Sequence, residues 1–284
     1  MPDELRDVAP PAPEPLDGEV FDSHCHFDAM AHRAGVIARD QPAPAGFVAA
    51  EMQRAASVGI TSVINVGCEV GEWASAVAST EHPDIYGAIA IHPTEVNGIT
   101  DDHYVELEAL LQREKIVAVG ETGLDYYWDR TTPVDQQRHF RRHIELAKRV
   151  GKPLMIHDRD AHADVLRILA EEGAPEAGVV FHAFSGDAAM AAECVAAGYL
   201  LSFAGVLTFK NAPALRAAAL ITPLDQILVE TDAPFLTAHP FRGRPNAPYL
   251  IPHVVRAISR LKEVPEQVVC ATISATGRRV FGLV

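Results

Sequence analysis

The feature that most constrains the fold of this chain is a regular alternation of short apolar runs with longer segments of helical periodicity. The runs are rich in β-branched and aromatic residues, which favours strands. They lie at Glu19–Ser23, Ser62–Val66, Ile85–Ile91, Ile116–Gly120, Pro153–Ile156, Val179–Phe181, Tyr199–Phe203 and Gln226–Val229. Strands that alternate with helices predict a parallel sheet, and eight such units are what a closed (β/α)8 TIM barrel requires.

The segments between the runs carry helix signals. Gln136–Val150 is followed by Gly151 and Pro153, a typical helix end before a strand. Further helices are expected at Phe47–Val58, Trp73–Ser79, Asp102–Glu114, Ala163–Glu172 and Ala188–Ala197, with two more after Tyr249 that separate near Pro265. An open doubly wound sheet is the alternative, but no GxGxxG follows the first strand, which disfavours its dinucleotide-binding form.

The length by itself leaves the number of domains open. The chain has 284 residues, of which 48% are hydrophobic, which suits one large barrel or two small domains. The strand–helix alternation and the absence of an internal linker favour one barrel over residues 19–284. Residues 1–18 are acidic and rich in proline, so we expect a disordered tail there. We find neither a secretory signal nor an apolar run of about 20 residues. We therefore expect a cytoplasmic protein that does not bind a membrane, and we expect it to be a monomer.

The charge balance limits the binding partners. The chain holds 24 Lys and Arg against 38 Asp and Glu, a formal net charge of −14. Such a surface repels a polyanion, which disfavours a protein that coats nucleic acid without specificity. It does not exclude an enzyme that admits one phosphodiester to a metal centre, because bound cations can dominate the local field.

Metal-binding side chains recur where the expected strands end. His24 and His26 are two residues apart at the end of the first strand, so they point to the same side, the interior of a barrel. Four later strand ends carry Glu121, His157, His182 and Asp232. Barrel active sites assemble at this C-terminal face, so the pattern predicts a metal centre. The alternative is a structural plug of polar side chains.

Four imidazoles and two carboxylates exceed the needs of one tetrahedral site and suit two divalent ions. Glu121, from the middle of the barrel, is the expected bridge. His24, His26 and Asp232 would hold one ion, since the first and last strands are neighbours in a closed barrel. His157 and His182 would hold the other. We expect Asp232 to accept the proton of the attacking water, and His92 to bind phosphate, to transfer a proton or to be purely structural.

Six motifs appear in order along almost the whole chain after the tail: DSHCHFD, AIHP, GETGLDYYW, HDRDAH, FHAFSG and ETDAPFL. Together they resemble the TatD family of metal-dependent deoxyribonucleases. The resemblance implies a TIM barrel of the metallo-dependent hydrolase superfamily, the same six metal ligands, and a functional role for His92. It also implies that Glu121 stands where the wider superfamily often has a carboxylated lysine.

Candidate substrate contacts lie in the loops after the strands. Tyr126, Tyr127 and Trp128 could stack on bases or could simply pack within their loop. Arg159 follows His157 by two residues and could meet a phosphate. Arg242 and Arg244 follow the last strand and could do the same or remain solvated loop charges.

The leading functional hypothesis is a metal-dependent DNA phosphodiesterase, a 3′–5′ exonuclease-type DNase that favours single-stranded ends and uses a hydroxide activated by two metal ions. The first alternative is a D-aminoacyl-tRNA deacylase or another carboxylic-ester or amide hydrolase that uses the same site. The second is a barrel that binds a partner without turnover, which an intact ligand set disfavours. Imidazole-rich sites suit Zn or Mn better than Mg, whereas family members are usually described as Mg-dependent, so the metal stays open.

Overall fold

The computed structural model describes residues 6–39 and 41–283 as a barrel of eight parallel strands in the order β1 to β8. The strands are β1 Val20–Cys25, β2 Ile60–Gly67, β3 Ile85–Ile89, β4 Ile116–Asp125, β5 Leu154–Arg159, β6 Val179–Phe181, β7 Leu200–Phe203 and β8 Ile227–Val229. The chain after β8 meets β1, where the Asp232 amide donates to the His24 carbonyl over 2.9 Å. The predicted barrel and all eight of its strands are therefore confirmed.

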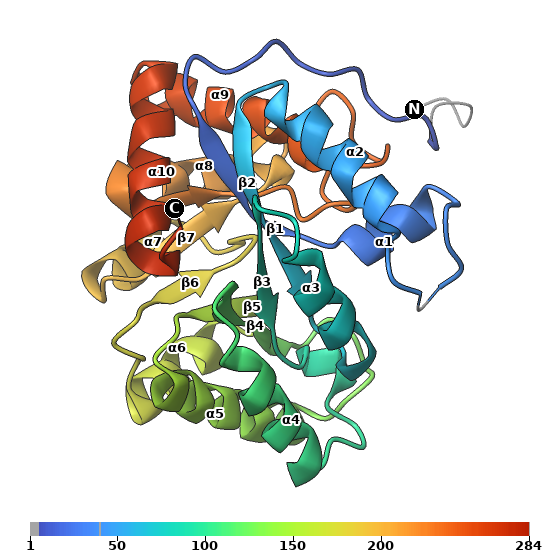
Figure 1. Cartoon of the computed structure of the whole chain (residues 1–284). Coiled ribbons are helices and arrows are strands. Elements are labelled where there is room, and N and C mark those ends of the chain that lie inside the picture. Colours follow the sequence, from blue (N-terminus) through green and yellow to red (C-terminus); the bar gives the residue numbers. More distant parts are fainter. Residues whose placement is uncertain (1–5, 40, 284) are drawn as a thin grey trace.

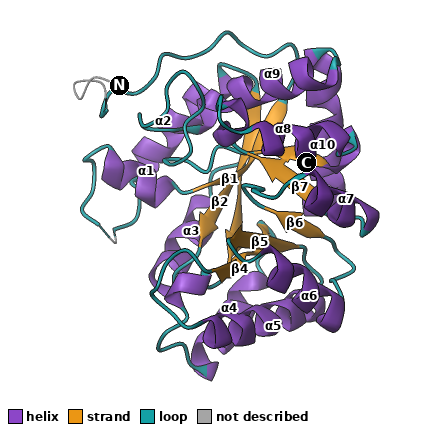
Figure 2. Cartoon of the chain, turned by 180° about the vertical axis from the view of Figure 1, so that it is seen from behind, coloured by secondary structure: helices purple, strands orange, loops and turns teal. Residues whose placement is uncertain are grey.

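Helices cover the outside of the barrel (Figure 1), and the view from behind shows the strands enclosed by them (Figure 2). They are α1 Phe27–Arg33, α2 Ala45–Ala56, α3 Trp73–Ser79, α4 Asp101–Leu111, α5 Pro133–Val150, α6 His162–Glu172, α7 Ala188–Ala196, α8 Pro213–Ile221, α9 Ile251–Lys262 and α10 Glu266–Phe281. Sequence patterns missed α1 and α8, because both are short and neither has a long amphipathic period. Across the described residues, no helix combines the length and the apolar content that crossing a bilayer requires.

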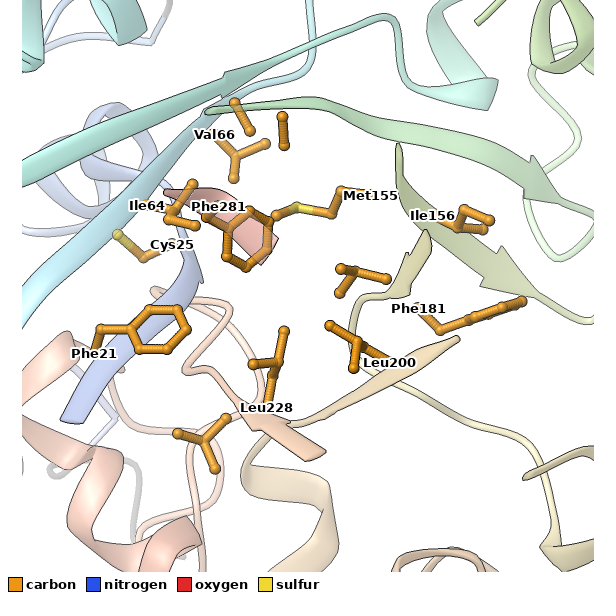
Figure 3. Packing of buried hydrophobic residues seen from close by; sticks show 14 of the residues in the cluster. Phe21, Cys25, Ile64, Val66, Met155, Ile156, Phe181, Leu200, Leu228 and Phe281 are labelled. Carbon is orange, nitrogen blue, oxygen red and sulfur yellow. The ribbon is translucent and has the colours of Figure 1, made fainter. Parts of the chain in front are cut away.

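Buried apolar side chains fill the barrel interior and the layer beneath the helices. Phe21 of β1 meets Phe281 of α10 edge to face, with ring centroids 6.2 Å apart. Figure 3 shows these rings together with Met155, which rises from β5. The Met155 sulfur lies 3.1 Å from His24 Nδ1, so the core reaches directly to the first polar layer at the C-terminal ends of the strands.

The segment before β1 differs from the expected disordered tail. Its backbone carbonyls accept hydrogen bonds from the side chains of Arg244, Tyr249 and Arg256, and the side chain of Leu16 is buried. A proline-rich backbone is already extended, so it loses little conformational entropy when it docks. The expectation of disorder is wrong for residues 8–18, and residues 1–5 of the expected tail lie outside the described residues.

Gly123 of β4 packs closely against the backbone of β5. Its φ is +144°, and a Cβ added there would lie 2.1 Å from the carbonyl oxygen of His157. We expect Gly123→Ala to lower the free energy of unfolding by about 1–3 kcal/mol, because the backbone of β5 must shift. Urea denaturation measures the change. Gly46→Ala is the control, since nothing lies within 4 Å of its new Cβ; equal stabilities of the two variants would contradict the prediction.

Candidate metal centre

The fold brings all six expected ligands to one end of the barrel. His24 lies in β1 and His26 one residue beyond it, so their alternate spacing points both side chains inward. Glu121 and His157 come from β4 and β5. His182 follows β6 directly, and Asp232 follows β8 by three residues. Side chains from five strands therefore converge at the C-terminal face, where barrel active sites form.

Glu121 occupies the centre of this cluster. Its Oε2 atom lies 3.1 Å from His24 Nε2 and 3.7 Å from His26 Nε2. Its Oε1 atom lies 2.7 Å from His157 Nδ1 and 3.3 Å from His182 Nε2. Two ligands held tetrahedrally at about 2.0–2.2 Å from one ion lie about 3.3–3.6 Å apart. The two carboxylate oxygens therefore face different histidines, at distances close to those between two ligands of one ion. The two sides also touch, since the His24 and His182 rings stack with centroids 3.9 Å apart and form a further close group with Glu230.

Asp232 completes the group on the Oε2 side. Its Oδ1 atom lies 3.5 Å from His26 Nε2 and 3.8 Å from His24 Nε2. The ligand atoms of these three residues all fall within 4.8 Å of one another. On the Oε1 side, an equally close group consists of Glu121, His157 and His92. His92, for which sequence analysis left three roles open, thus lies inside the cluster, with Nε2 3.4 Å from Glu121 Oε1.

Each imidazole that faces the carboxylates is held through its other nitrogen. His26 Nδ1 donates to the Val66 carbonyl over 3.1 Å. His157 Nε2 lies 2.9 Å from Asp125 Oδ2, and His182 Nδ1 lies 2.9 Å from Glu230 Oε1. Such partners fix the tautomer and the ring plane of a metal-binding histidine. Sequence analysis missed Asp125, although it belongs to the GETGLD stretch.

The ionisable groups of the cluster shift one another's pKa values in a way that favours the binding of cations. Burial raises the pKa of the Glu121 carboxyl, but the charge of His182 and the hydrogen bond from His157 outweigh it and hold the pKa well below its ordinary value. Burial lowers the pKa of His24 to about 3. Burial also lowers that of His26, but the hydrogen bond to Asp232 and the charge of Glu121 overcome it and raise the pKa to about 9. Protons on some imidazoles thus balance the carboxylates, and divalent ions would displace those protons on binding.

An aromatic cluster beside the centre contains two of the expected substrate contacts. Tyr127 is 54% exposed and Trp128 is 47% exposed, and both backbone amides donate to Asp125 Oδ1 over 3.0 Å. The Arg159 guanidinium carbon lies 3.7 Å from the Tyr127 ring centroid. Because Asp125 also binds His157, this cluster is tied to the metal centre. Phe235, 50% exposed and 6.3 Å from the His26 ring, is an additional rim residue that the sequence did not single out.

Three other expected substrate contacts make contacts within the protein instead. The Tyr126 hydroxyl donates to Asp164 Oδ2 over 2.7 Å. Arg244 donates to the carbonyls of Val8 and Ala9 over 2.8 and 2.7 Å, so its fork holds the N-terminal segment. The guanidinium carbon of Arg242 lies over the Phe209 ring, 4.6 Å from its centroid. The polar groups of Tyr126 and Arg244 thus have protein partners far away in the sequence, and the substrate roles of both residues stay predictions.

An eight-stranded barrel with imidazoles and carboxylates gathered at its C-terminal face defines the class of metal-dependent hydrolases. The chain belongs to the TatD related DNase family, which it matches over residues 21–282. The metal-dependent hydrolase TatD of Mycobacterium tuberculosis is 45% identical over 93% of this chain and 98% of its own length. YabD of Bacillus subtilis is 36% identical over 92% and 98%. The crystal structure of the TatD homologue YjjV of Escherichia coli superposes with a TM-score of 0.83 at 30% identity, covering 93% of this chain and 98% of that one.

The two-sided arrangement predicts how metal content responds to substitution. Wild-type protein should bind about two divalent ions per chain. His182→Ala should lose one of them, whereas Glu121→Ala should lose both, because the carboxylate serves both groups of donors. Equilibrium dialysis against Mn²⁺ followed by elemental analysis measures the content. The exposed His32→Ala should retain both ions, and a single ion that survives Glu121→Ala would contradict a bridging role.

Proposed function

We propose that the protein is a metal-dependent phosphodiesterase that degrades DNA from single-stranded ends, with 3′–5′ polarity. The observation that carries the proposal is the position of Glu121 between two groups of metal-binding side chains. Paired divalent ions are typical of enzymes that displace an oxygen of a phosphodiester in line. Membership of the TatD related DNase family supports DNA as the substrate class.

The donor set fits two divalent ions, one held by His24, His26 and Asp232 and the other by His157 and His182, with Glu121 shared. Ions held there supply Lewis acidity toward a phosphoryl oxygen and make water acidic near neutral pH. Asp232 suits the role of proton acceptor, because its carboxylate reaches the cluster and its side chain stays 14% exposed. It can therefore pass a proton to solvent.

His92 suits the role of hydrogen-bond donor to the substrate. Its Nδ1 atom lies 3.1 Å from the Thr94 amide nitrogen and 2.7 Å from the Thr94 hydroxyl oxygen. In the tautomer in which Nδ1 accepts from the amide, the proton is on Nε2, the atom that faces Glu121. Burial lowers the pKa of His92, so the ring is neutral at pH 7. A neutral Nε2–H can donate to a non-bridging phosphoryl oxygen without opposing the nearby cations.

Arg159 and Tyr127 are positioned to contact the part of the DNA strand that leads away from the scissile bond. Arg159 is two residues beyond His157 on β5, so its side chain leaves the same face about 6.6 Å farther along. Its guanidinium can bind a phosphate while the exposed rings of Tyr127 and Trp128 offer surfaces for bases. The net charge of the chain is −14, so most of its surface repels DNA. A single positive contact near the barrel mouth therefore favours binding of the end of a DNA strand over binding of a long DNA segment.

The main test is hydrolysis of end-labelled single-stranded DNA by metal-stripped protein after Mg²⁺, Mn²⁺ or Zn²⁺ is restored singly. We expect at least one ion to restore cleavage, and Glu121→Ala to reduce the rate at least ~100-fold, because removing partners of metal ligands alone costs about 10–100-fold. Protein that binds two ions but cleaves no DNA with any of them would overturn the proposal. A D-aminoacyl-tRNA ester would then be the next substrate to assay.

The rim cluster predicts a dependence on substrate length. Arg159→Gln and Tyr127→Ala should each raise KM for a single-stranded oligonucleotide about tenfold, in line with the loss of one stacking or phosphate contact. Their kcat/KM for bis(4-nitrophenyl) phosphate, which has one phosphodiester, should stay within about twofold of wild type. Arg113→Gln is the matched control, since this exposed arginine precedes β4 at the opposite end of the barrel. Equal effects on both substrates would exclude the strand contact.

A further inference from the structure

Helix α5 carries a row of buried polar side chains on its inward face. Gln136, His139 and His143 are three and four residues apart, so they share one side of the helix. They are only 1%, 3% and 0% exposed. Burying polar groups costs free energy unless they are hydrogen-bonded, so their partners indicate what the row is for. Two of the three side chains bind the backbone next to the metal centre.

His143 acts as a hydrogen-bond acceptor for β3. Its Nδ1 atom donates to the His139 carbonyl over 2.8 Å, which leaves Nε2 with a free lone pair. That atom accepts from the amide of Ile91 over 3.2 Å. The pairing of β3 with β4 ends at Ile89 and Val119, so no strand carbonyl is available to the Ile91 amide. Burial lowers the pKa of His143 to about 3, which keeps the ring neutral and able to accept.

The backbone that His143 holds leads directly into His92. The His92 amide donates to the Cys68 carbonyl at the end of β2 over 2.8 Å. The chain entering His92 is thus fixed on one side by β2 and on the other by α5. These two contacts set the direction in which the imidazole of His92 leaves the barrel wall toward Glu121.

Gln136 holds Asp125 in the same way. Its Oε1 atom accepts from the Asp125 amide and its Nε2 atom donates to the Asp125 carbonyl, both over 2.8 Å. Asp125 in turn contacts His157 Nε2 through its carboxylate. Gln136 Nε2 also donates to Thr131 Oγ1, which donates to the Pro93 carbonyl over 2.7 Å. One amide side chain thereby connects the ends of β3 and β4.

We propose that this inward face of α5 positions the metal centre from behind: His143 sets His92 through the Ile91 amide, and Gln136 sets His157 through Asp125. Neither side chain faces the reacting atoms, so both are positioning residues. The inference rests on the metal-dependent hydrolase class of the protein and not on DNA as its substrate.

The first arm of the test concerns His143. His143→Leu should accelerate amide hydrogen exchange in peptides covering residues 87–97 at least tenfold. It should also lower kcat for bis(4-nitrophenyl) phosphate about 10–100-fold with little change in KM. His143→Gln should restore both readouts, because its amide oxygen can accept from Ile91. His143→Asn, which keeps the amide but is too short to reach, should behave like leucine and covers the case in which His143→Leu does not fold.

The second arm concerns Gln136 and needs no turnover. Gln136→Leu should weaken Mn²⁺ binding about 10–100-fold and accelerate exchange over residues 121–128. Phe140→Leu is the matched control, since Phe140 is equally buried on the same helix but has no polar partner. It should lower Tm without altering Mn²⁺ affinity or exchange at residues 87–97 and 121–128.

Two outcomes would overturn the inference. In one, His143→Gln is no better than His143→Leu. In the other, Phe140→Leu reproduces the changes in exchange and metal binding, which would reduce α5 to a structural support. Failure of DNA cleavage alone would leave both arms informative, because exchange and Mn²⁺ binding are measured without nucleic acid.

Discussion

The candidate metal centre depends on one buried carboxylate that must be balanced from two sides. Glu121 is only 4% exposed, and an isolated buried charge is too costly to retain. Imidazoles from β1 and β5 and from the end of β6 surround its two oxygens. Because these groups come from different parts of the chain, the charge is compensated only when the barrel has formed. The site and the fold are therefore one cooperative unit, and bound divalent ions would stabilise both.

The orientation of the candidate histidine ligands is set by hydrogen bonds from their outer nitrogens to a backbone carbonyl or a carboxylate. Val66, Asp125 and Glu230 each hold the far nitrogen of one histidine. Asp125 has a second function, since its other oxygen binds the amides of Tyr127 and Trp128. Asp125 therefore connects His157, a candidate metal ligand, to the exposed aromatic side chains at the rim. Changes at the rim and at the centre should be coupled in this protein.

Helix α5 and the segment before β1 lie outside the barrel and support the candidate metal centre by holding the loops beside it. Helix α5 presents solvated charges outward and hydrogen-bonding side chains inward, so it combines a soluble face with a support for the centre. The segment before β1 is held by Arg244, Tyr249 and Arg256, all of which follow β8. It thereby anchors the chain that follows Asp232. Cations bound at such a centre would set the local field there, whatever the net charge of the whole chain.

The sequence by itself determined the barrel and the six candidate ligands. Apolar strand runs and helix ends are local patterns, and the C-terminal end of each run points to one face of a parallel barrel. Only the tertiary structure decided which polar groups hold those side chains and which partners the loop arginines have within the protein. Asp125 and His143 act across contacts between elements, and Arg244 and Tyr126 bind partners far along the chain. Local periodicity carries no information on such pairings, because they depend on how helices and loops pack against the closed barrel.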